Sequence, residues 1–164
     1  VIARGLSAFE PVKGRSRAFG VVCQGHAVTG VDDTYNANPD SVRAAIDVLA
    51  ELPGPHLLVL GDMGEVGAQG PEFHQEVGAH ARASGIEHLM CLGELAAFSV
   101  QAYGTGAQHF SHIEALTTQV LQLLPHVGSV LVKGSRFMKM EQVVEALVQQ
   151  AAEINNKKGE AHAA

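Results

Sequence analysis

Basic residues are scarce in this chain of 164 residues, which has 11 Lys and Arg against 17 Asp and Glu and a formal net charge of -6. No segment gathers the basic residues into a dense patch. Binding to duplex nucleic acid depends on clustered Lys and Arg side chains that neutralise phosphates. The composition therefore argues against a nucleic-acid partner.

Cysteines and long apolar runs are scarce as well. Cys23 and Cys91 both lie in apolar segments, and two cysteines are too few for a disulfide framework, so we expect buried thiols in a reducing compartment. No apolar run approaches the roughly 18 residues that span a bilayer, and the N-terminus lacks a signal-peptide pattern. We expect a cytoplasmic chain without a membrane partner.

Three common site motifs are missing. The sequence has no GxGxxG dinucleotide fingerprint, no GxxxxGK(S/T) phosphate loop and no GxSxG nucleophile elbow. Of the nine histidines only His109 and His112 form a close pair, and no Cys or acidic residues have metal-ligand spacing. The sequence thus predicts neither a phosphate-cradling loop nor a metal centre in this chain.

What the sequence does contain is a regular alternation of two apolar patterns. Nearly continuous apolar runs predict buried parallel strands, and apolar residues spaced three and four apart predict amphipathic helices. The expected strands are 56–62, 87–93, 107–111 and 129–135, and the expected helices are 39–52, 71–84, 94–103, 112–124 and 137–154. This order predicts an α/β fold, Rossmann-like and doubly wound, with a mostly parallel sheet and right-handed crossovers.

The first 31 residues depart from this alternation. Two strand-like runs surround the turn signal "QGH" with no helix between them, which predicts a hairpin. The hairpin is either an antiparallel edge of the sheet or the remnant of a preceding domain. We expect 1–31 to end a central domain, 32–154 to form the Rossmann-like domain, and the polar tail 155–164 to be disordered.

Polar residues follow the predicted strands at the point where each strand ends. Ligands of doubly wound sheets bind outside the carboxyl ends of the strands, so these groups should converge on one edge. They are Asp32 and Asp33, "GDMGE" at 61–65, Gly93 with Glu94, and "KGSR" at 133–136. Taken singly, each also fits a plain turn or helix cap, for example at Asn36 and Asn38. Jointly, four polar loops on one edge favour a binding site.

Three of these segments resemble the carboxy-terminal domain of the Mur ligases, namely "DDTYNANPDS", "LVLGDMGEVG" and "VLVKGSRFMKME". The segment "GLSAFEPVKGR" is similar to the end of the central ATPase domain in that family. Because "YNANP" and "GDMGE" occur together, the resemblance is to the branch that adds D-alanyl-D-alanine to UDP-N-acetylmuramoyl-tripeptide in peptidoglycan synthesis.

The resemblance implies ATP-dependent amide formation through an acyl phosphate, with Mg²⁺ shielding the phosphates. The implied partners are ATP, UDP-N-acetylmuramoyl-tripeptide, D-alanyl-D-alanine, and the enzyme's own N-terminal and central domains. The family's phosphate loop, magnesium ligands and modified lysine belong to a region before Val1. We therefore expect this chain to be part of a longer ligase and to be inactive by itself.

The resemblance also implies roles for single residues near the nucleotide. Arg15 matches the arginine that reaches the ATP phosphates, and Lys133 is the second implied catalytic residue. The residues implied at the ribose and adenine are Asp33, Tyr35, Asn36 and Asn38. A planar, permanently charged guanidinium group suits phosphate, and aromatic faces and amide edges suit a base.

A second implied group faces the substrate cleft. Ser135 and Arg136 match the "KGSR" loop of the family, and Asp62 and Glu65 lie in a cleft-facing loop. An acidic side chain in that loop is suited to receive the ammonium group of the dipeptide. The resemblance does not assign the individual contacts of either loop.

Two alternatives come from other functional classes. A phospho-receiver domain also has a βα repeat, with paired acids after the first strand and a lysine after the last, which fits Asp32, Asp33, Asp62 and Lys133. However, a receiver is phosphorylated after its third strand. Here Asp62 follows only the second strand, when the strand-like run before Asp32 is counted as the first. The other alternative is a structural interaction domain in which the polar loops are only caps and turns.

Overall fold

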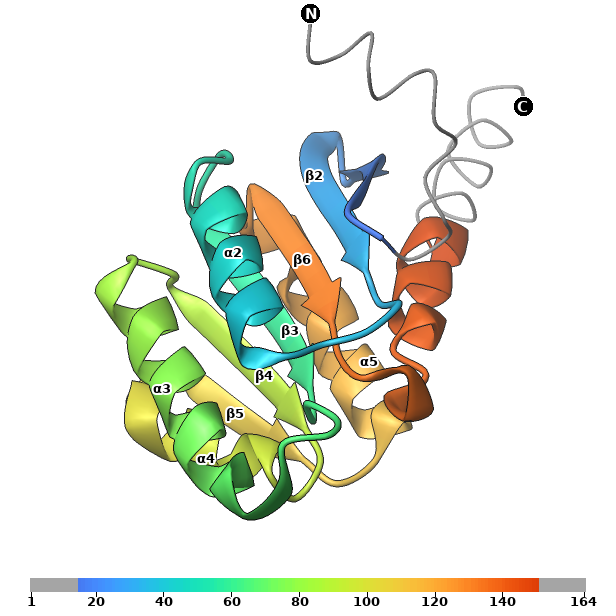
Figure 1. The fold of residues 1–164 in the computed structure, drawn as a ribbon. Helices are drawn as coiled ribbons and strands as arrows, with labels where there is room; N and C mark the ends of the chain where they lie inside the picture. The colour runs from blue at the N-terminus through green and yellow to red at the C-terminus, as the bar shows by residue number, and fades with distance from the viewer. Residues whose placement is uncertain (1–14, 151–164) are drawn as a thin grey trace, which may run out of the picture.

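The computed structural model describes residues 15–150 and contains one six-stranded sheet with the order β1-β2-β6-β3-β4-β5 (Figure 1). The strands are β1 (Arg17–Cys23), β2 (His26–Asp33), β3 (His56–Gly61), β4 (His88–Leu92), β5 (Ala107–Phe110) and β6 (Ser129–Lys133). β1 runs antiparallel to β2, and every other neighbouring pair is parallel. The sheet is therefore mixed but mostly parallel, as the sequence predicted.

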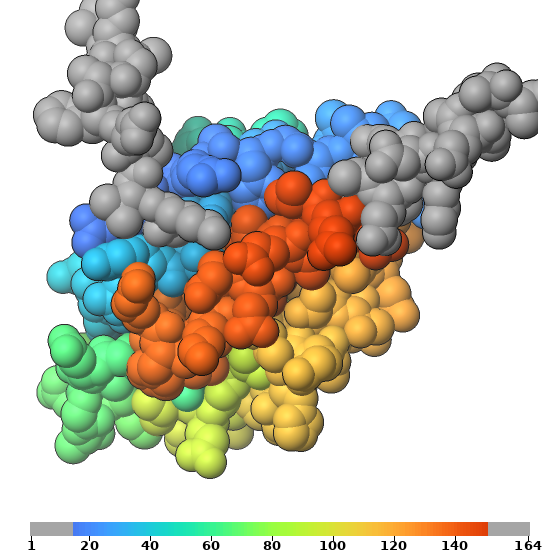
Figure 2. Space-filling view, turned by 90° about the vertical axis from the view of Figure 1, so that its right-hand side faces the viewer, coloured from blue at the N-terminus to red at the C-terminus, as the bar shows by residue number. Residues whose placement is uncertain are grey.

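Helices cover both faces of the sheet (Figure 1). One face carries α2 (Pro39–Ala50), α3 (Gly70–Ala83) and α4 (Ala96–Tyr103), and the other carries α5 (Ile113–Leu123) and a last helix described over 141–150. Figure 2 shows this last helix between the hairpin and α5. No helix within the described residues is long and apolar enough to cross a membrane.

The core consists of two apolar clusters, one on each face of the sheet. Along β3, Leu58 and Leu60 pack into the cluster with α2 and α3, while Leu57 and Val59 pack into the cluster with α5 and the last helix. Successive side chains of a strand point to opposite faces, so a strand covered on both sides needs a continuous apolar run. This explains why "HLLVLG" reads as an uninterrupted apolar segment.

The predicted strands and the first four predicted helices are present, with ends that differ by no more than two residues. The predicted start of the last helix is wrong. Arg136–Met138 form a 3-10 turn, and Lys139 has a left-handed backbone with φ of 55°. A residue in that conformation cannot continue a right-handed helix, so the last helix begins at residue 141 instead of residue 137.

The predicted hairpin is the antiparallel edge of the sheet. Gln24 and Gly25 connect its strands with positive φ angles of 53° and 78°, as a tight type I′ turn requires. β2 then pairs with β6 from Thr29 to Asp33, so the sheet has no break at the expected domain boundary. The assignment of 1–31 to a preceding domain stays a prediction, and the predicted tail at 155–164 lies outside the described residues.

The strand order also decides one alternative. Among the parallel strands the last one, β6, lies between the first and the second, β2 and β3. A flavodoxin-like receiver has its first strand between the second and the third, in the order 2-1-3-4-5. The topology is therefore not that of a receiver domain.

Both cysteines are buried and free, as expected. Cys91 lies in the central part of β4, where burial raises the pKa of its thiol far above the ordinary value. A thiol held in its neutral form behaves as a small apolar side chain. Cys91 therefore contributes packing between β4 and the cluster that includes α2 and α3.

Candidate functional site

The loops that follow β2, β3 and β6 meet at one edge of the sheet, where the strand arrows end in Figure 1. The parallel pairing brings Asp33 of β2 opposite Lys133 of β6, and Leu60 of β3 opposite the same lysine. Asp62 follows β3 directly and accepts a hydrogen bond from Ser135 N through its backbone oxygen at 2.9 Å. The expected convergence of Asp33, Asp62 and Lys133 on one edge is thus present.

Lys133 is buried, with 3% of its surface exposed, and it binds the loop between β2 and α2. Its Nζ donates to Asp33 Oδ2 at 2.8 Å and to the backbone oxygen of Asn36 at 2.9 Å. Asp33 Oδ1 in turn accepts from Ser16 N at 3.1 Å. A buried ammonium group needs such partners. In this conformation Lys133 therefore fixes the loop, and its ammonium group is engaged within the protein.

Local hydrogen bonds also shape the loop between β2 and α2. Asp32 Oδ1 accepts from Thr34 Oγ1 at 2.6 Å, which stabilises the turn after β2. Asn38 caps α2, because its Oδ1 accepts from Ser41 N at 2.8 Å while Ser41 Oγ accepts from Asn38 N at 3.0 Å. Together with Pro39 at the first helical position, this is a complete capping box. The capping role considered for Asn38 is therefore real.

Asn36 is exposed, and its side chain is only partly used. Its Oδ1 accepts from Ala37 N at 2.8 Å. Within the described part of the chain, no hydrogen bond involves its side-chain NH₂ group. Asn36 therefore presents two amide donors at the site edge, which suits recognition of a ligand acceptor.

The Asp62 side chain is buried, and one of its carboxylate oxygens is hydrogen-bonded within the protein. Its Oδ1 accepts from Ala96 N at 2.7 Å, at the first residue of α4. Gly93 makes room for this contact, since a Cβ built at Gly93 would lie 2.4 Å from the Asp62 carboxylate. The carboxylate therefore caps α4 and joins the loops after β3 and β4.

His74, which the sequence reasoning did not single out, supports the loop after β3 from beneath the site edge. It is fully buried on α3, and its Nε2 accepts from Met63 N at 3.0 Å while its Nδ1 donates to Gly70 O at 2.6 Å. Burial lowers the pKa of His74, and the two hydrogen bonds fix the proton on Nδ1. The available signal was its spacing of three and seven residues before Val77 and Ala81, which places it on the buried face of α3.

Tyr35 carries two guanidinium groups over its ring. The Cζ of Arg15 lies 4.0 Å from the ring centroid, and the Cζ of Arg136 lies 4.8 Å from it. Both distances are within the range of cation–π attraction. The structure therefore brings together the implied phosphate residue, the implied adenine residue and one residue of the "KGSR" loop.

Ser135 precedes this arginine and is buried, with 2% of its surface exposed. Its Oγ is the only buried side-chain oxygen or nitrogen without a hydrogen-bond partner in the described part of the molecule. The Ser135 side chain packs close to Gly64, where an added Cβ would lie 3.3 Å from Ser135 Cβ. Burial of an unpaired hydroxyl costs free energy, so the Ser135 hydroxyl does not stabilise this edge through a hydrogen bond within the described residues.

A hollow of about 420 Å³ lies between the β2–α2 loop and the β3–α3 loop. It collects three of the predicted residues, Asn36, Asn38 and Glu65, and Glu65 holds a left-handed backbone with φ of 56°. Its complete lining is Asn36, Ala37, Asn38, Pro39, Asp40, Gly64, Glu65, Val66 and Phe73. The side chains of Asp62 and Lys133 are not part of this lining.

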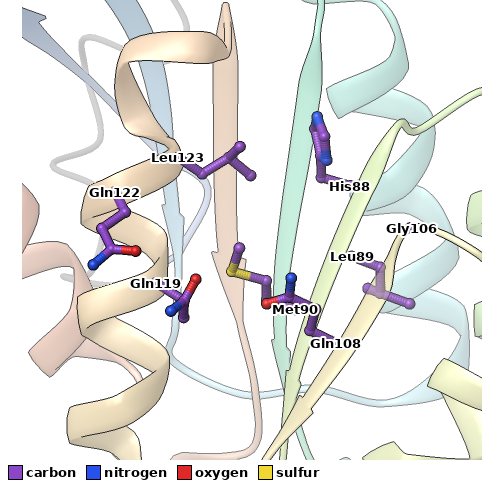
Figure 3. A pocket seen from close by; sticks show the side chains of 8 residues that line it. All are labelled: His88, Leu89, Met90, Gly106, Gln108, Gln119, Gln122 and Leu123. Atoms are coloured by element: carbon purple, nitrogen blue, oxygen red, sulfur yellow. The ribbon is translucent and has the colours of Figure 1, made fainter.

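Figure 3 shows a separate hollow of about 260 Å³ beside β4, β5 and α5. His88 begins β4 and Gly106 directly precedes β5, so this hollow lies toward the amino ends of the strands. Gln108 of β5 and the glutamines of α5, Gln119 and Gln122, line it with neutral amides. It is therefore distinct from the site at the carboxyl edge.

The described residues do not group into a metal site. In the range 15–150, no three His, Cys, Asp or Glu side chains are grouped so that they could hold a metal ion. Asp33 is paired with Lys133, and Asp62 caps α4. The donor set for Mg²⁺ is therefore not supplied by this part of the chain.

Comparison with known proteins gives a consistent result. A family model described as "Mur ligase, glutamate ligase domain" matches residues 17–136. A UDP-N-acetylmuramoyl-tripeptide–D-alanyl-D-alanine ligase of Escherichia coli is 44% identical over 119 residues, which cover 71% of this chain and 26% of that protein. The corresponding ligase of Synechocystis is 36% identical over 88% of this chain and 32% of its own length.

Solved structures agree with these relatives. A crystal structure of MurF from Acinetobacter baumannii matches with a TM-score of 0.76 and 32% identity, over 90% of this chain and 33% of that one. MurF from Thermotoga maritima, solved in complex with ADP, shares the fold with a TM-score of 0.72 at 24% identity. This chain covers 36% of that chain, so across the four proteins named here it spans between about a quarter and just over a third of their length.

Proposed function

Because this chain belongs to the Mur ligase family, we propose that it is the carboxy-terminal part of a ligase that joins D-alanyl-D-alanine to UDP-N-acetylmuramoyl-tripeptide at the expense of ATP. The observation that carries this proposal is the 44% identity to a ligase of that name over 119 residues. Three loops within residues 17–136, the range that the family model matches, follow β2, β3 and β6 and meet at one edge of the sheet. The residues that match the family model therefore include all three loops of the site edge.

In the proposed reaction, the terminal carboxylate of the tripeptide is phosphorylated by ATP, and the amine of the dipeptide then displaces phosphate. Such chemistry depends mainly on positioning and on stabilising charge. This chain would supply one wall of the closed site, with Asn36 and Tyr35 at the adenine side and Arg15 at the phosphates. Lys133 would act indirectly, because it holds Asp33 and the backbone of Asn36 in place.

The dipeptide ammonium is proposed to meet the hollow between the β2–α2 and β3–α3 loops. Glu65 and Asp40 both line it, and both side chains are exposed. A carboxylate in a partly enclosed site attracts an ammonium group and orients it. Asp62 is less suited to this role because its carboxylate already caps α4.

Other parts of the catalytic machinery are proposed to lie outside this chain. The sequence contains no phosphate loop, and the described residues hold no magnesium donor set. The partners of this part would therefore be the N-terminal and central domains of the same ligase, in the cytoplasm. When bound, Mg²⁺ would shield phosphate charge, and no role in holding it is proposed for residues of this chain.

The proposal that other catalytic parts lie outside this chain can be tested on the chain by itself. We expect residues 1–164 to melt cooperatively, to release no phosphate from ATP and to bind ATP with a Kd on the order of 1 mM. The backbone amide signals of Tyr35 and Asn36 should shift on titration with ATP in an ¹⁵N-labelled sample. Turnover of roughly 1 per second or faster would contradict the proposal, because it would place the catalytic machinery within this chain.

A further inference from the structure

Two successive residues of the loop after β3, Asp62 and Met63, are held by three different elements. Met63 N donates to Nε2 of His74 on α3 at 3.0 Å. The backbone oxygen of Asp62 accepts from Ser135 N in the loop after β6 at 2.9 Å, and its carboxylate accepts from Ala96 N of α4 at 2.7 Å. This pair of residues is therefore a fixed point at the base of the loop.

The bond from Met63 requires His74 in one particular form. Nδ1 of the ring faces Gly70 O at 2.6 Å, and a carbonyl oxygen can only accept, so Nδ1 carries the proton and Nε2 keeps a lone pair for Met63 N. The backbone of His74 is fixed as well, because Ser99 Oγ of α4 donates to His74 O at 2.6 Å. Gly78 lets α3 and α4 approach closely, since an added Cβ there would overlap Ser99 O. The ring can therefore not shift without disturbing both helices.

Glu65, two residues after Met63, has a backbone conformation that is unusual for a residue with a side chain. Its φ of 56° lies in the left-handed region, where Cβ crowds the backbone. A residue stays in such a conformation only when the structure around it fixes the chain. The Glu65 side chain is exposed, and within residues 15–150 it makes no hydrogen bond or ion pair. Its direction is therefore set by the backbone of the loop and not by contacts of the carboxylate.

Glu65 lines the hollow between the β2–α2 and β3–α3 loops, and so does Phe73, the residue before His74 on α3. His74 is fully buried and is not part of that lining. We propose that His74 is a positioning residue of this hollow, which through Met63 keeps Glu65 left-handed and its carboxylate at the hollow. This role rests on the proposed function, in which a carboxylate there receives the ammonium group of the dipeptide.

Of the three bonds to the fixed point, the one to His74 is the nearest to Glu65 along the chain. Met63 is 1% exposed, so without the His74 acceptor its N–H would be buried and unpaired, which costs free energy. The N–H regains a partner only if the loop moves, and the same movement lets Glu65 leave the left-handed region. Loss of the acceptor should therefore turn the Glu65 carboxylate away and weaken binding of a cation, without removing any group that contacts the cation.

The first measurement uses the unaltered chain of 164 residues, labelled with ¹⁵N and ¹³C. The ¹⁵N shifts of the two His74 ring nitrogens report which one carries the proton. The distance between the amide proton and Hα of Glu65, measured by the nuclear Overhauser effect, is short only when φ is positive. We expect the proton on Nδ1 and a short distance. A proton on Nε2 or a negative φ would overturn the positioning role without any substitution.

The second measurement compares three variants that thermal melts show to be folded. His74→Leu removes the acceptor, whereas His74→Gln keeps an amide oxygen that can accept from Met63 N. Val77→Ala is the matched control, because Val77 is buried one turn further along α3 and its truncation lowers stability through a cavity while leaving the bond to Met63 in place. The ligand is D-alanyl-D-alanine, and N-acetyl-D-alanyl-D-alanine, which lacks the ammonium group, is its control.

We expect Glu65 to lose its short distance in His74→Leu alone, and the dipeptide to bind that variant about fivefold more weakly, as befits the loss of one buried hydrogen bond. His74→Gln should bind within about twofold of the unaltered chain. Val77→Ala should melt at a lower temperature and otherwise behave like the unaltered chain. Retention of activity by the glutamine variant distinguishes positioning from a general loss of stability.

Two results from folded variants would overturn the positioning role: an unchanged Glu65 in His74→Leu, or an equal change in Val77→Ala. The proposed function is judged separately by the two peptides. If Glu65 changes only in His74→Leu while the unaltered chain binds neither peptide, or both equally, the positioning role stands and the ammonium site is wrong. If the dipeptide binds all variants equally and the acetylated peptide does not bind, the ammonium site stands and the positioning role is wrong. If His74→Leu does not fold, the ring proton and the Glu65 distance in the unaltered chain decide.

Discussion

At the scale of single residues, the candidate site depends on buried polar groups whose partners are far away in the sequence. The sequence predicted which residues would lie at the site edge, because each follows a strand. It did not predict that Asp62 would turn its carboxylate to Ala96, or that Met63 would bind His74. Such contacts depend on how the loops after different strands pack, and no local pattern encodes that packing.

His74 leads to a prediction on pH. Its pKa in the folded chain lies below the ordinary value of 6.5, so the unfolded chain binds more protons at mildly acidic pH. The free energy of unfolding should therefore be fully maintained above pH 6.5 and should fall as the pH drops below it. Urea unfolding at several pH values from about 7.5 to about 5, a range on both sides of the ordinary histidine pKa, measures how steeply the free energy of unfolding changes with pH.

The control for this prediction is a pair of substitutions. His74→Gln should flatten the slope below the ordinary histidine pKa, because it removes the group that must stay neutral. His112→Gln, at an exposed position just before α5, should leave the slope as it is. An unchanged slope in His74→Gln would show that another group causes the acid sensitivity.

Ser135 and Ser99 give a matched pair of buried hydroxyls. Ser99 Oγ donates to His74 O at 2.6 Å, whereas Ser135 Oγ has no partner in the described part of the chain. We expect Ser99→Ala to lower the free energy of unfolding by about 1 kcal/mol, and Ser135→Ala to change it by less than about 0.5 kcal/mol or to raise it. Denaturant unfolding of the two variants measures this difference. A larger loss in Ser135→Ala would mean that its hydroxyl is paired in solution.

At the scale of elements, the helices and strands could be read from their apolar periodicity because the core has one cluster on each face of the sheet. The strand order could not, since the parallel strands are similarly apolar and nothing local places β6 between β2 and β3. The strand order was also needed to decide whether the hairpin pairs with the edge of this sheet or belongs to a separate domain. The start of the last helix was missed because Lys139 adopts a left-handed conformation that its residue type does not suggest.

The contact between the loops after β3 and β4 can be tested at Gly93. Gly93 has a φ of 112°, and an added Cβ would lie 2.4 Å from the Asp62 carboxylate. Gly104 has a φ of 89° with nothing within 4 Å of an added Cβ, so Gly104→Ala measures the backbone strain alone. We expect Gly104→Ala to cost about 1 kcal/mol and Gly93→Ala to cost at least about 2 kcal/mol more.

The same variants distinguish strain from loss of the cap on α4. If the two alanine variants unfold at the same urea concentration, the close approach of Asp62 to Gly93 does not exist in solution. If Gly93→Ala is the less stable chain, its amide signals near Ala96 should also shift, because the Asp62 carboxylate that caps α4 must move. The loops after β3 and β4 would then form one unit.

At the scale of the whole molecule, the chain is a three-layer α/β domain of the Mur ligase family with its polar loops at one edge of the sheet. It spans about a third or less of the length of the Escherichia coli, Synechocystis and Acinetobacter baumannii proteins compared above. The edge carries the hollow between the β2–α2 and β3–α3 loops and two guanidinium groups over the ring of Tyr35, so it presents polar and charged groups to a ligand.

The most direct test of the proposed function is a chimera in which residues 15–150 replace the matching part of the Escherichia coli ligase. Phosphate release is measured with ATP, UDP-N-acetylmuramoyl-tripeptide and D-alanyl-D-alanine together, and with each one omitted. We predict phosphate release that requires all three substrates, at a rate within about tenfold of the parent's, which corresponds to about 1.4 kcal/mol in the barrier. A folded chimera that binds ATP but releases no phosphate with all three substrates, or releases it equally without the dipeptide, would contradict it.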